Sequence, residues 1–279
     1  MSTLPGNPWK RSGILAKAGL KTGGNYLRHH VGNAIPLKSF HQNKVTLNRK
    51  NALSLIGELS QLRGAALKMA QGLSMDTGIL PEEFAEVMNS AQYRVPPMNR
   101  SLVQIQFKKA MGVVPEKLFN NFEYDAFAAA TIGQVHRAED KKGRLLADKI
   151  QYPNVRRSID SDLALLKTLA GSFLRKFDIS EHLEEMKLRL LEETDYCKEG
   201  QNIEEFHQRF SSEMLLFPEY IGEHSNSKIL CMTRLDGIHL DEFLNQNPSQ
   251  LKKDHYGQIL WDFFQIHITQ NNQTFHADV

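Results

Sequence analysis

The chain has 279 residues, of which 41% are hydrophobic and 24% are charged. This composition excludes a disordered chain, a collagen-like fibre and a disulfide-stapled miniprotein. The net charge of +2 hides an asymmetry, because residues 1–50 contain nine Lys or Arg and no Asp or Glu, which leaves the rest of the chain at −7. An acid-free basic arm favours an anionic membrane surface or an organelle-targeting role, with a solvated leader as the plain alternative. Nucleic acid is not expected as a partner, since no recognition motif follows the arm.

The sequence shows neither a transmembrane nor a secretory pattern. No apolar run reaches the roughly 18–20 residues of a membrane-spanning helix, and no signal-peptide h-region is present. The two cysteines, Cys197 and Cys231, lack zinc or redox spacing, which favours a reducing compartment. We therefore expect a cytoplasmic protein, peripheral at the inner membrane, with a mitochondrial location as the alternative.

Residues 51–118 are expected to form a helical N-terminal extension. Apolar residues recur at helical spacing from about 51 to 75, and Pro81 is suited to open a second helix. A third helix is predicted from about Ser101 to Met111, ended by Gly112.

From residue 119 onward the pattern changes to short strands and helices. Such an order predicts an α+β fold, in which a small antiparallel sheet carries a helix on one face. Strand-like segments are expected near 126–138, 145–152, 217–221 and 228–234, a turn at 141–143, and helices near 159–177 and 181–210.

The last predicted helix, at about 256–268, is apolar almost all round. A helix of this kind belongs inside a protein. Only eleven residues follow it, so the sequence predicts that this part of the fold is incomplete.

Four patches could carry chemistry. The small residues between Ala128 and Val135 would let backbone N–H groups approach a phosphate, although a tightly packed hairpin is the simpler interpretation. Lys149 could point inward toward phosphate oxygens or simply face water. Glu199 is a possible partner for a buried Lys149, unless it lies on a solvated helix face. His276-Ala277-Asp278 is similar to the start of a kinase catalytic loop.

Together these patches resemble the UbiB family of atypical protein-kinase-like proteins, which support ubiquinone (coenzyme Q) biosynthesis. Residues 62–71, LRGAALKMAQ, are similar to the family's K-x-G-Q signature, and residues 128–138, AAATIGQVHRA, to its alanine-rich nucleotide loop. Residues 149–153, KIQYP, match the segment around its ATP-anchoring lysine. Residues 193–196, ETDY, followed by Glu199 and Asn202, resemble its E-x-D-Y helix. Residues 232–237 resemble the hinge.

The resemblance implies an atypical kinase-like fold with ATP and Mg²⁺ as cofactors. It divides the chain into a basic arm (1–50), a helical extension with the K-x-G/A-Q motif (51–118), a kinase-like N-lobe (119–237) and the start of a largely missing C-lobe (238–279). The implied nucleotide-binding residues are Ala128, Ala129, Ala130, Thr131, Gly133, Lys149, Glu199 and Met232. The implied catalytic residue is Asp278, and the implied regulatory residues are Lys68 and Gln71, with Glu193 and Asp195 as their polar partners.

Three positions depart from the family pattern. Ala70 replaces the signature glycine, which keeps the helix. Asp148 replaces an apolar residue and faces away from Lys149 on a strand, where it is harmless in solvent and costly if buried. The magnesium-binding Asn and the D-F-G-like motif, expected beyond Asp278, are absent from these 279 residues, which predicts nucleotide binding without complete catalysis.

The expected function is that of a UbiB-type ATP-binding protein, with ATPase or small-molecule kinase activity in the family. Its expected partners are ATP, a quinone-lipid or anionic membrane surface, and other coenzyme Q biosynthesis proteins. The alternatives are a non-catalytic membrane-surface or interaction module and a non-functional truncated product.

Overall fold

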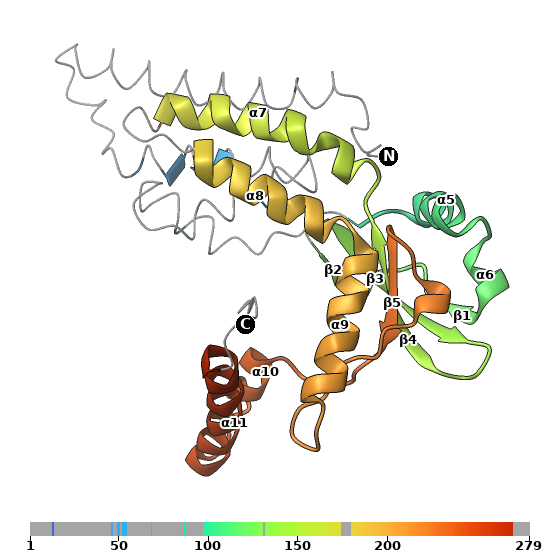
Figure 1. Cartoon of the computed structure of the whole chain (residues 1–279), viewed down its shortest axis with the longest axis vertical. Helices are drawn as coiled ribbons and strands as arrows, with labels where there is room; N and C mark the ends of the chain where they lie inside the picture. Colours follow the sequence, from blue (N-terminus) through green and yellow to red (C-terminus); the bar gives the residue numbers. More distant parts are fainter. Residues whose placement is uncertain are drawn as a thin grey trace. The chain divides into compact units, whose positions relative to one another are not determined.

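The computed structural model describes residues 97–130, 132–173 and 180–269, together with a few isolated positions before 97, Lys68 among them. The chain divides into two compact units, Met1–Glu205 with Glu219–Arg234, and Phe206–Pro218 with Leu235–Val279. Figure 1 labels their elements. The helices are α5 (Arg100–Met111), α6 (Pro115–Leu118), α7 (Val155–Phe173), α8 (Ser180–Glu193), α9 (Tyr196–Phe210), the 3₁₀ turn η1 (Gly222–His224), α10 (Leu240–Asn245) and α11 (Gln250–Thr269).

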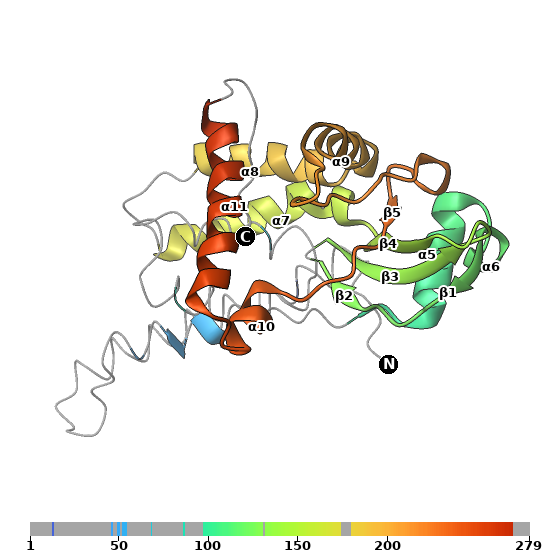
Figure 2. The same cartoon turned by 90° about the horizontal axis from the view of Figure 1, so that it is seen from below.

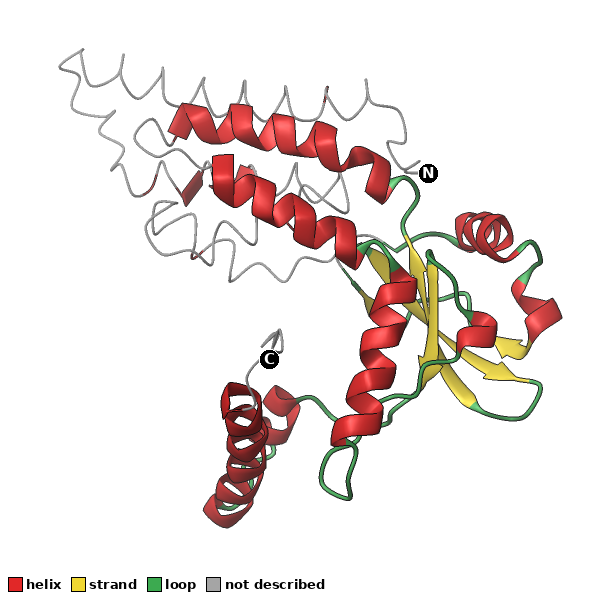
Figure 3. Ribbon diagram, in the orientation of Figure 1, coloured by secondary structure: helices red, strands yellow, loops and turns green. Residues whose placement is uncertain are grey.

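The first unit contains a five-stranded antiparallel sheet, drawn in yellow in Figure 3. Its main strand order is β1-β3-β4-β5, and β2 pairs with the outer part of β3. Strand β4 therefore pairs with a strand on each side. Its side chains alternate between the two faces of the sheet. The strands are β1 (Phe119–Phe122), β2 (Ala128–Ala129), β3 (Gly133–Asp140), β4 (Leu145–Gln151) and β5 (Ile229–Thr233).

The predicted α+β fold with a small antiparallel sheet is confirmed. The turn at 141–143 is present: Gly143 adopts a φ of 81°, and the Asp140 carboxylate accepts hydrogen bonds from the amides of Lys142 and Arg144. The strand predicted at 217–221 is wrong, because only an isolated bridge joins Tyr220 to Met232. Pro218 lies inside this segment and Gly222 follows it, and both residue types weaken strands.

Helices cover both faces of the sheet, whereas the sequence predicted one (Figure 2). Helix α5 begins at the cap residue Asn99, whose side chain accepts the Leu102 amide at 2.9 Å, and it ends at Gly112 with a φ of 78°. Its Phe107 packs edge-on against Phe119 and Phe122 of β1. Helix α9 lies on the opposite face, which carries Lys149.

The helix predicted at 181–210 is in fact two helices. The chain leaves α8 at Thr194, and Asp195 starts α9 by accepting the Cys197 amide with its side chain at 3.2 Å. Short polar side chains of this type satisfy the free N–H groups at a helix start. The break turns α9 toward the sheet and brings its first turn beside β4.

The second unit contains α10 and α11. Phe263 of α11 packs against Phe210 and Phe217, while Leu251, Tyr256 and Trp261 are at least half exposed. Among the residues that the structure describes, no helix combines the length and the apolar character that crossing a bilayer requires.

Candidate functional site

Lys149 stands at the centre of the candidate site. In β4 its register partners are Val135 on β3 and Leu230 on β5, and its side chain projects from the face opposite Asp148 and Ile150. Its Nζ donates a hydrogen bond to Oε1 of Glu199 at 2.6 Å. The Lys149 side chain is only 17% exposed and that of Glu199 is 32% exposed, so the pair is shielded more than a surface salt bridge.

Glu199 reaches Lys149 because it lies in the first turn of α9. The ion pair joins two residues that are fifty positions apart in the chain. The alternatives of a water-facing Lys149 and a solvated Glu199 are therefore wrong. A half-buried pair of opposite charges avoids the cost of burying either charge alone.

Tyr196 is a site residue to which the sequence analysis assigned no role. The Lys149 ammonium lies 5.0 Å from the centre of its ring, which adds a cation–π contact. Tyr196 is fully buried, and desolvation, followed by the charge of Glu199, raises the pKa of its phenol well above the usual value. The tyrosine thus forms a neutral aromatic wall beside the lysine. The sequence signal that could have identified Tyr196 is its position directly after the acidic Glu193–Asp195 segment, at the start of a helix.

The alanine-rich segment forms the hairpin that the sequence analysis weighed as its alternative. Ala128 and Ala129 pair with Val135 and Gln134 of β3, and the Ala130 amide donates to the Gly133 carbonyl at 2.9 Å. Ala128 and Ala129 are exposed and Ala130 is half-buried, so these small side chains leave open space above the sheet edge. Thr131 lies outside the described residues.

Gly133 is required by close packing. A Cβ atom at this position would lie 2.7 Å from the Ile150 carbonyl oxygen and 2.8 Å from the Tyr196 hydroxyl oxygen. The first contact is with backbone, which cannot rotate away. Gly133 therefore lets the hairpin lie directly against β4 and Tyr196.

Met232 shares a sheet face with Lys149. It pairs with Ala147 on β4 and is half-buried near the end of β5. This position is consistent with the hinge that the resemblance implies.

Of the two acids expected to partner Lys68, only Glu193 contacts it among the described residues. Lys68 Nζ lies 3.5 Å from Oε1 of Glu193, with both side chains about one-third exposed. Asp195 instead caps α9 through the Cys197 amide. Gln71 and Asp278 lie outside the described residues.

One group of three metal-ligating side chains occurs among the described residues, formed by Asp140, Glu223 and His224. Arg144 forms ion pairs with both carboxylates, at 2.6 Å to Asp140 and 2.5 Å to Glu223. The Asp140 carboxylate also holds the β3–β4 turn. The cluster is accordingly a structural tie between this turn and η1.

A strand lysine paired with a helix glutamate is the arrangement that protein kinases use at the phosphates of ATP, and it indicates a kinase-like class. The model of the ABC1 atypical kinase-like domain matches residues 90–279. The chain belongs to this ABC1/UbiB family.

Curated relatives agree with this assignment. The chain is 32% identical over 199 residues to the mitochondrial atypical kinase COQ8 of Saccharomyces cerevisiae, covering 70% of this chain and 40% of the relative. It is 32% identical over 196 residues to a probable protein kinase UbiB of Aeromonas hydrophila, covering 67% and 36%. It thus spans about two-fifths of the length of these relatives.

Among solved structures, a complex of Rv3197 with erythromycin from Mycobacterium tuberculosis is similar, with a TM-score of 0.49 and 27% identity. The match covers 74% of this chain and 53% of that one.

Proposed function

We propose that this chain carries the nucleotide-binding part of a UbiB-type atypical kinase. In this proposal ATP binds on the sheet face that carries Lys149. A protein with this site would act in coenzyme Q biosynthesis through ATPase or small-molecule kinase activity. The observation that carries the proposal is the shielded Lys149–Glu199 pair at 2.6 Å.

The chemistry of the pair suits a triphosphate. An ammonium has three N–H donors, and among the described residues Lys149 gives one of them to Glu199. The remaining donors can bind phosphate oxygens, while Glu199 keeps the side chain in place. Tyr196 beneath the ammonium restricts its movement further.

The alanine-rich hairpin forms the other side of the proposed site. Its exposed methyl groups at Ala128 and Ala129 leave room for phosphates to approach the backbone. Met232 would lie near the base at the hinge. Lys68, held by Glu193, would limit access from the side where a protein substrate docks in ordinary kinases.

Magnesium would neutralise charge on the transferred phosphoryl group. The resemblance assigns Asp278 to the catalytic loop, and we propose that ligands for the ion belong to the family's catalytic segment rather than to the sheet. The described sheet residues supply binding and orientation of the nucleotide.

The setting follows from the basic arm and the relatives. Residues 1–50, which lie outside the described residues except for a few positions, would hold the protein at an anionic or quinone-bearing membrane beside other coenzyme Q biosynthesis proteins. The relatives include bacterial UbiB and mitochondrial COQ8 proteins. We propose a peripheral position at the bacterial inner membrane, with the mitochondrion as the alternative.

The proposal is tested by measuring ATP affinity with and without Mg²⁺ by calorimetry. Lys149→Met should weaken binding by at least about tenfold, equivalent to about 1.4 kcal/mol, because the phosphates lose their cation. Lys198→Met is the matched control. Lys198 lies next to Glu199 in the same helical turn, and its substitution removes the same charge while breaking the exposed ion pair with Glu192.

The control should bind ATP like the wild type. Equal affinities in Lys149→Met and wild type, with both proteins folded by circular dichroism, would contradict a nucleotide site at Lys149. Equal losses in both variants would show a general charge effect instead of a site.

A further inference from the structure

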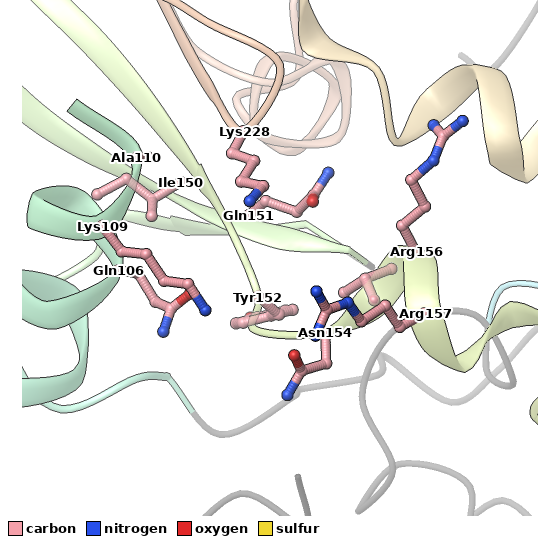
Figure 4. Close-up of a pocket in the computed structure, with 11 residues that line it drawn as sticks. Gln106, Lys109, Ala110, Ile150, Gln151, Tyr152, Asn154, Arg156, Arg157 and Lys228 are labelled. Atoms are coloured by element: carbon pink, nitrogen blue, oxygen red, sulfur yellow. The ribbon is translucent and has the colours of Figure 1, made fainter. Parts of the chain in front are cut away.

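A hollow lies on the other side of β4 from Lys149. It has a volume of about 250 Å³ and lies between α5, the end of β4, the start of α7 and the residue before β5 (Figure 4). Ile150, whose side chain projects from the face opposite Lys149, contributes to its apolar floor. Lys149 is not among the residues that line it, so the hollow is separate from the proposed nucleotide site.

The lining is strongly basic. Lys109 comes from α5, Arg157 from the first turn of α7, and Lys228 from the residue before β5. The lining also includes Arg156, but its guanidinium donates to the Leu191 carbonyl and the Thr194 hydroxyl and points toward α8 in Figure 4. Among the residues that the structure describes, the lining of the hollow includes no acidic side chain.

The three remaining cations are uncompensated in the part of the chain that the structure describes. None of them forms an ion pair there, whereas Lys187 and Arg189 on α8 are both paired with carboxylates. Three like charges at one concave site repel one another and create a positive potential that a bound anion would relieve.

Neutral donors in the same hollow add to this preference. The side chains of Gln106 and Asn154 line it, and so do the first residues of α7. Amides in the first turn of a helix lack intrahelical partners and carry partial positive charge. They supplement the three cations, which come from segments far apart in the sequence.

We propose that this hollow binds the phosphate group of a small phosphorylated molecule. Three cations match the two to three charged oxygens of a phosphomonoester or diphosphate better than a single carboxylate. The volume lies just below the usual range of about 300–1,000 Å³ for small-molecule sites. It is thus sufficient for a phosphate with a small organic part.

Binding of inorganic pyrophosphate and glycerol 3-phosphate to the ¹⁵N-labelled full chain tests the proposal. Amides of Lys109, Asn154 and Arg157 should shift on titration. A Lys109→Gln/Arg157→Gln/Lys228→Gln variant should lose at least about tenfold in affinity. A Lys108→Gln/Lys117→Gln/Lys141→Gln variant removes three exposed cations that do not line the hollow, and it should change affinity by less than about twofold because none of them contacts the bound anion and solvent screens exposed charges.

Vesicles of phosphatidylcholine with and without phosphatidic acid distinguish the source of the phosphate. Loss of phosphatidic-acid-dependent sedimentation only in the pocket variant assigns a lipid headgroup, and sedimentation equal in both variants assigns a soluble phosphate. The proposal is overturned if neither soluble probe binds, if both triple variants weaken binding equally, or if Lys149→Met abolishes pyrophosphate binding. The last result would place the anion at the nucleotide site.

Discussion

Replacing Asp148 with valine is expected to stabilise the first unit by about 1–3 kcal/mol near pH 4, the usual cost of an unsatisfied buried polar group, and by more at neutral pH, where the acid must also keep its proton in the folded state. The Asp148 side chain is fully buried, and neither carboxyl oxygen has a hydrogen-bond partner among the described residues. Burial raises its pKa to about 8, an effect that the thiol of Cys231, opposite it on β5, partly offsets.

The neighbouring histidine does not relieve this cost. His136 lies opposite Asp148 on β3, but its Nδ1 faces the Glu123 carbonyl and its Nε2 faces the Gln134 amide nitrogen, both at 2.9 Å. This network is satisfied by a neutral imidazole that donates from Nδ1 and accepts at Nε2. Burial also lowers the pKa of His136, which favours the same neutral form.

The stabilisation should depend on pH in a defined direction. The pKa of Asp148 is near 8 in the folded protein, against 3.8 for an ordinary aspartate, so the folded state holds its proton more tightly. The contribution of the Asp148 proton to the free energy of unfolding is fully present below pH 3.8. It is lost as the pH rises toward 8, at up to about 1.4 kcal/mol per pH unit.

Chemical denaturation between pH 5 and 8.5 measures this effect. The difference between Asp148→Val or Asp148→Asn and the wild type should widen with pH and level off above about pH 8. Asp125→Asn, at an exposed position, should follow the wild type. A constant difference across the range, or a destabilised Asp148→Val, would show that Asp148 is not a buried, uncompensated acid.

Gly133→Ala is expected to destabilise the protein by about 1–3 kcal/mol, as overpacking of a close contact does. The new methyl group would lie 2.7 Å from the Ile150 carbonyl oxygen and 2.8 Å from the Tyr196 hydroxyl oxygen. To relieve the clash, the hairpin must move away from β4 and Tyr196 must shift beneath Lys149. ATP affinity should therefore fall together with the unfolding free energy.

Gly143→Ala provides a contrast for this variant. Gly143 has open space around it but a φ of 81°, so its substitution strains the turn without touching the proposed nucleotide site. It should lower stability and leave ATP affinity unchanged in the folded protein. Equal ATP affinities in Gly133→Ala and Gly143→Ala would show that the packing of the hairpin against β4 and Tyr196 does not influence nucleotide binding.

The sequence predicted those parts of the fold that local patterns define. The helix at Ser101–Met111 was predicted to stop at Gly112 and does so, and the turn at 141–143 was predicted from its glycine. Strand β1 and helices α6 and α10 were not predicted, because four to six residues carry too little periodicity. The single helix expected at 181–210 was wrong because the capping potential of Thr194 and Asp195 was overlooked.

The candidate site depended on long-range information. Glu199 was a possible partner for Lys149 because a buried ammonium needs a carboxylate, and the family resemblance then assigned the pair. Fifty residues separate the two, so no spacing rule connects them. For Asp148 both a solvent-facing and a buried position stayed open. Strand β4 lies inside the sheet with helices on both faces, and alternation cannot reveal burial on two sides. The basic hollow was missed because Lys109, Arg157 and Lys228 meet only in the folded chain.

A double-mutant cycle on ATP affinity tests the central claim most directly. It compares Lys149→Met, Glu199→Gln and the double variant with the wild type. If Glu199 acts by holding Lys149, Glu199→Gln should weaken binding in the wild type and should change it by less than about 0.5 kcal/mol once Lys149 is gone. Additive losses, or an ATP affinity that neither substitution alters, would contradict a nucleotide site organised by this pair.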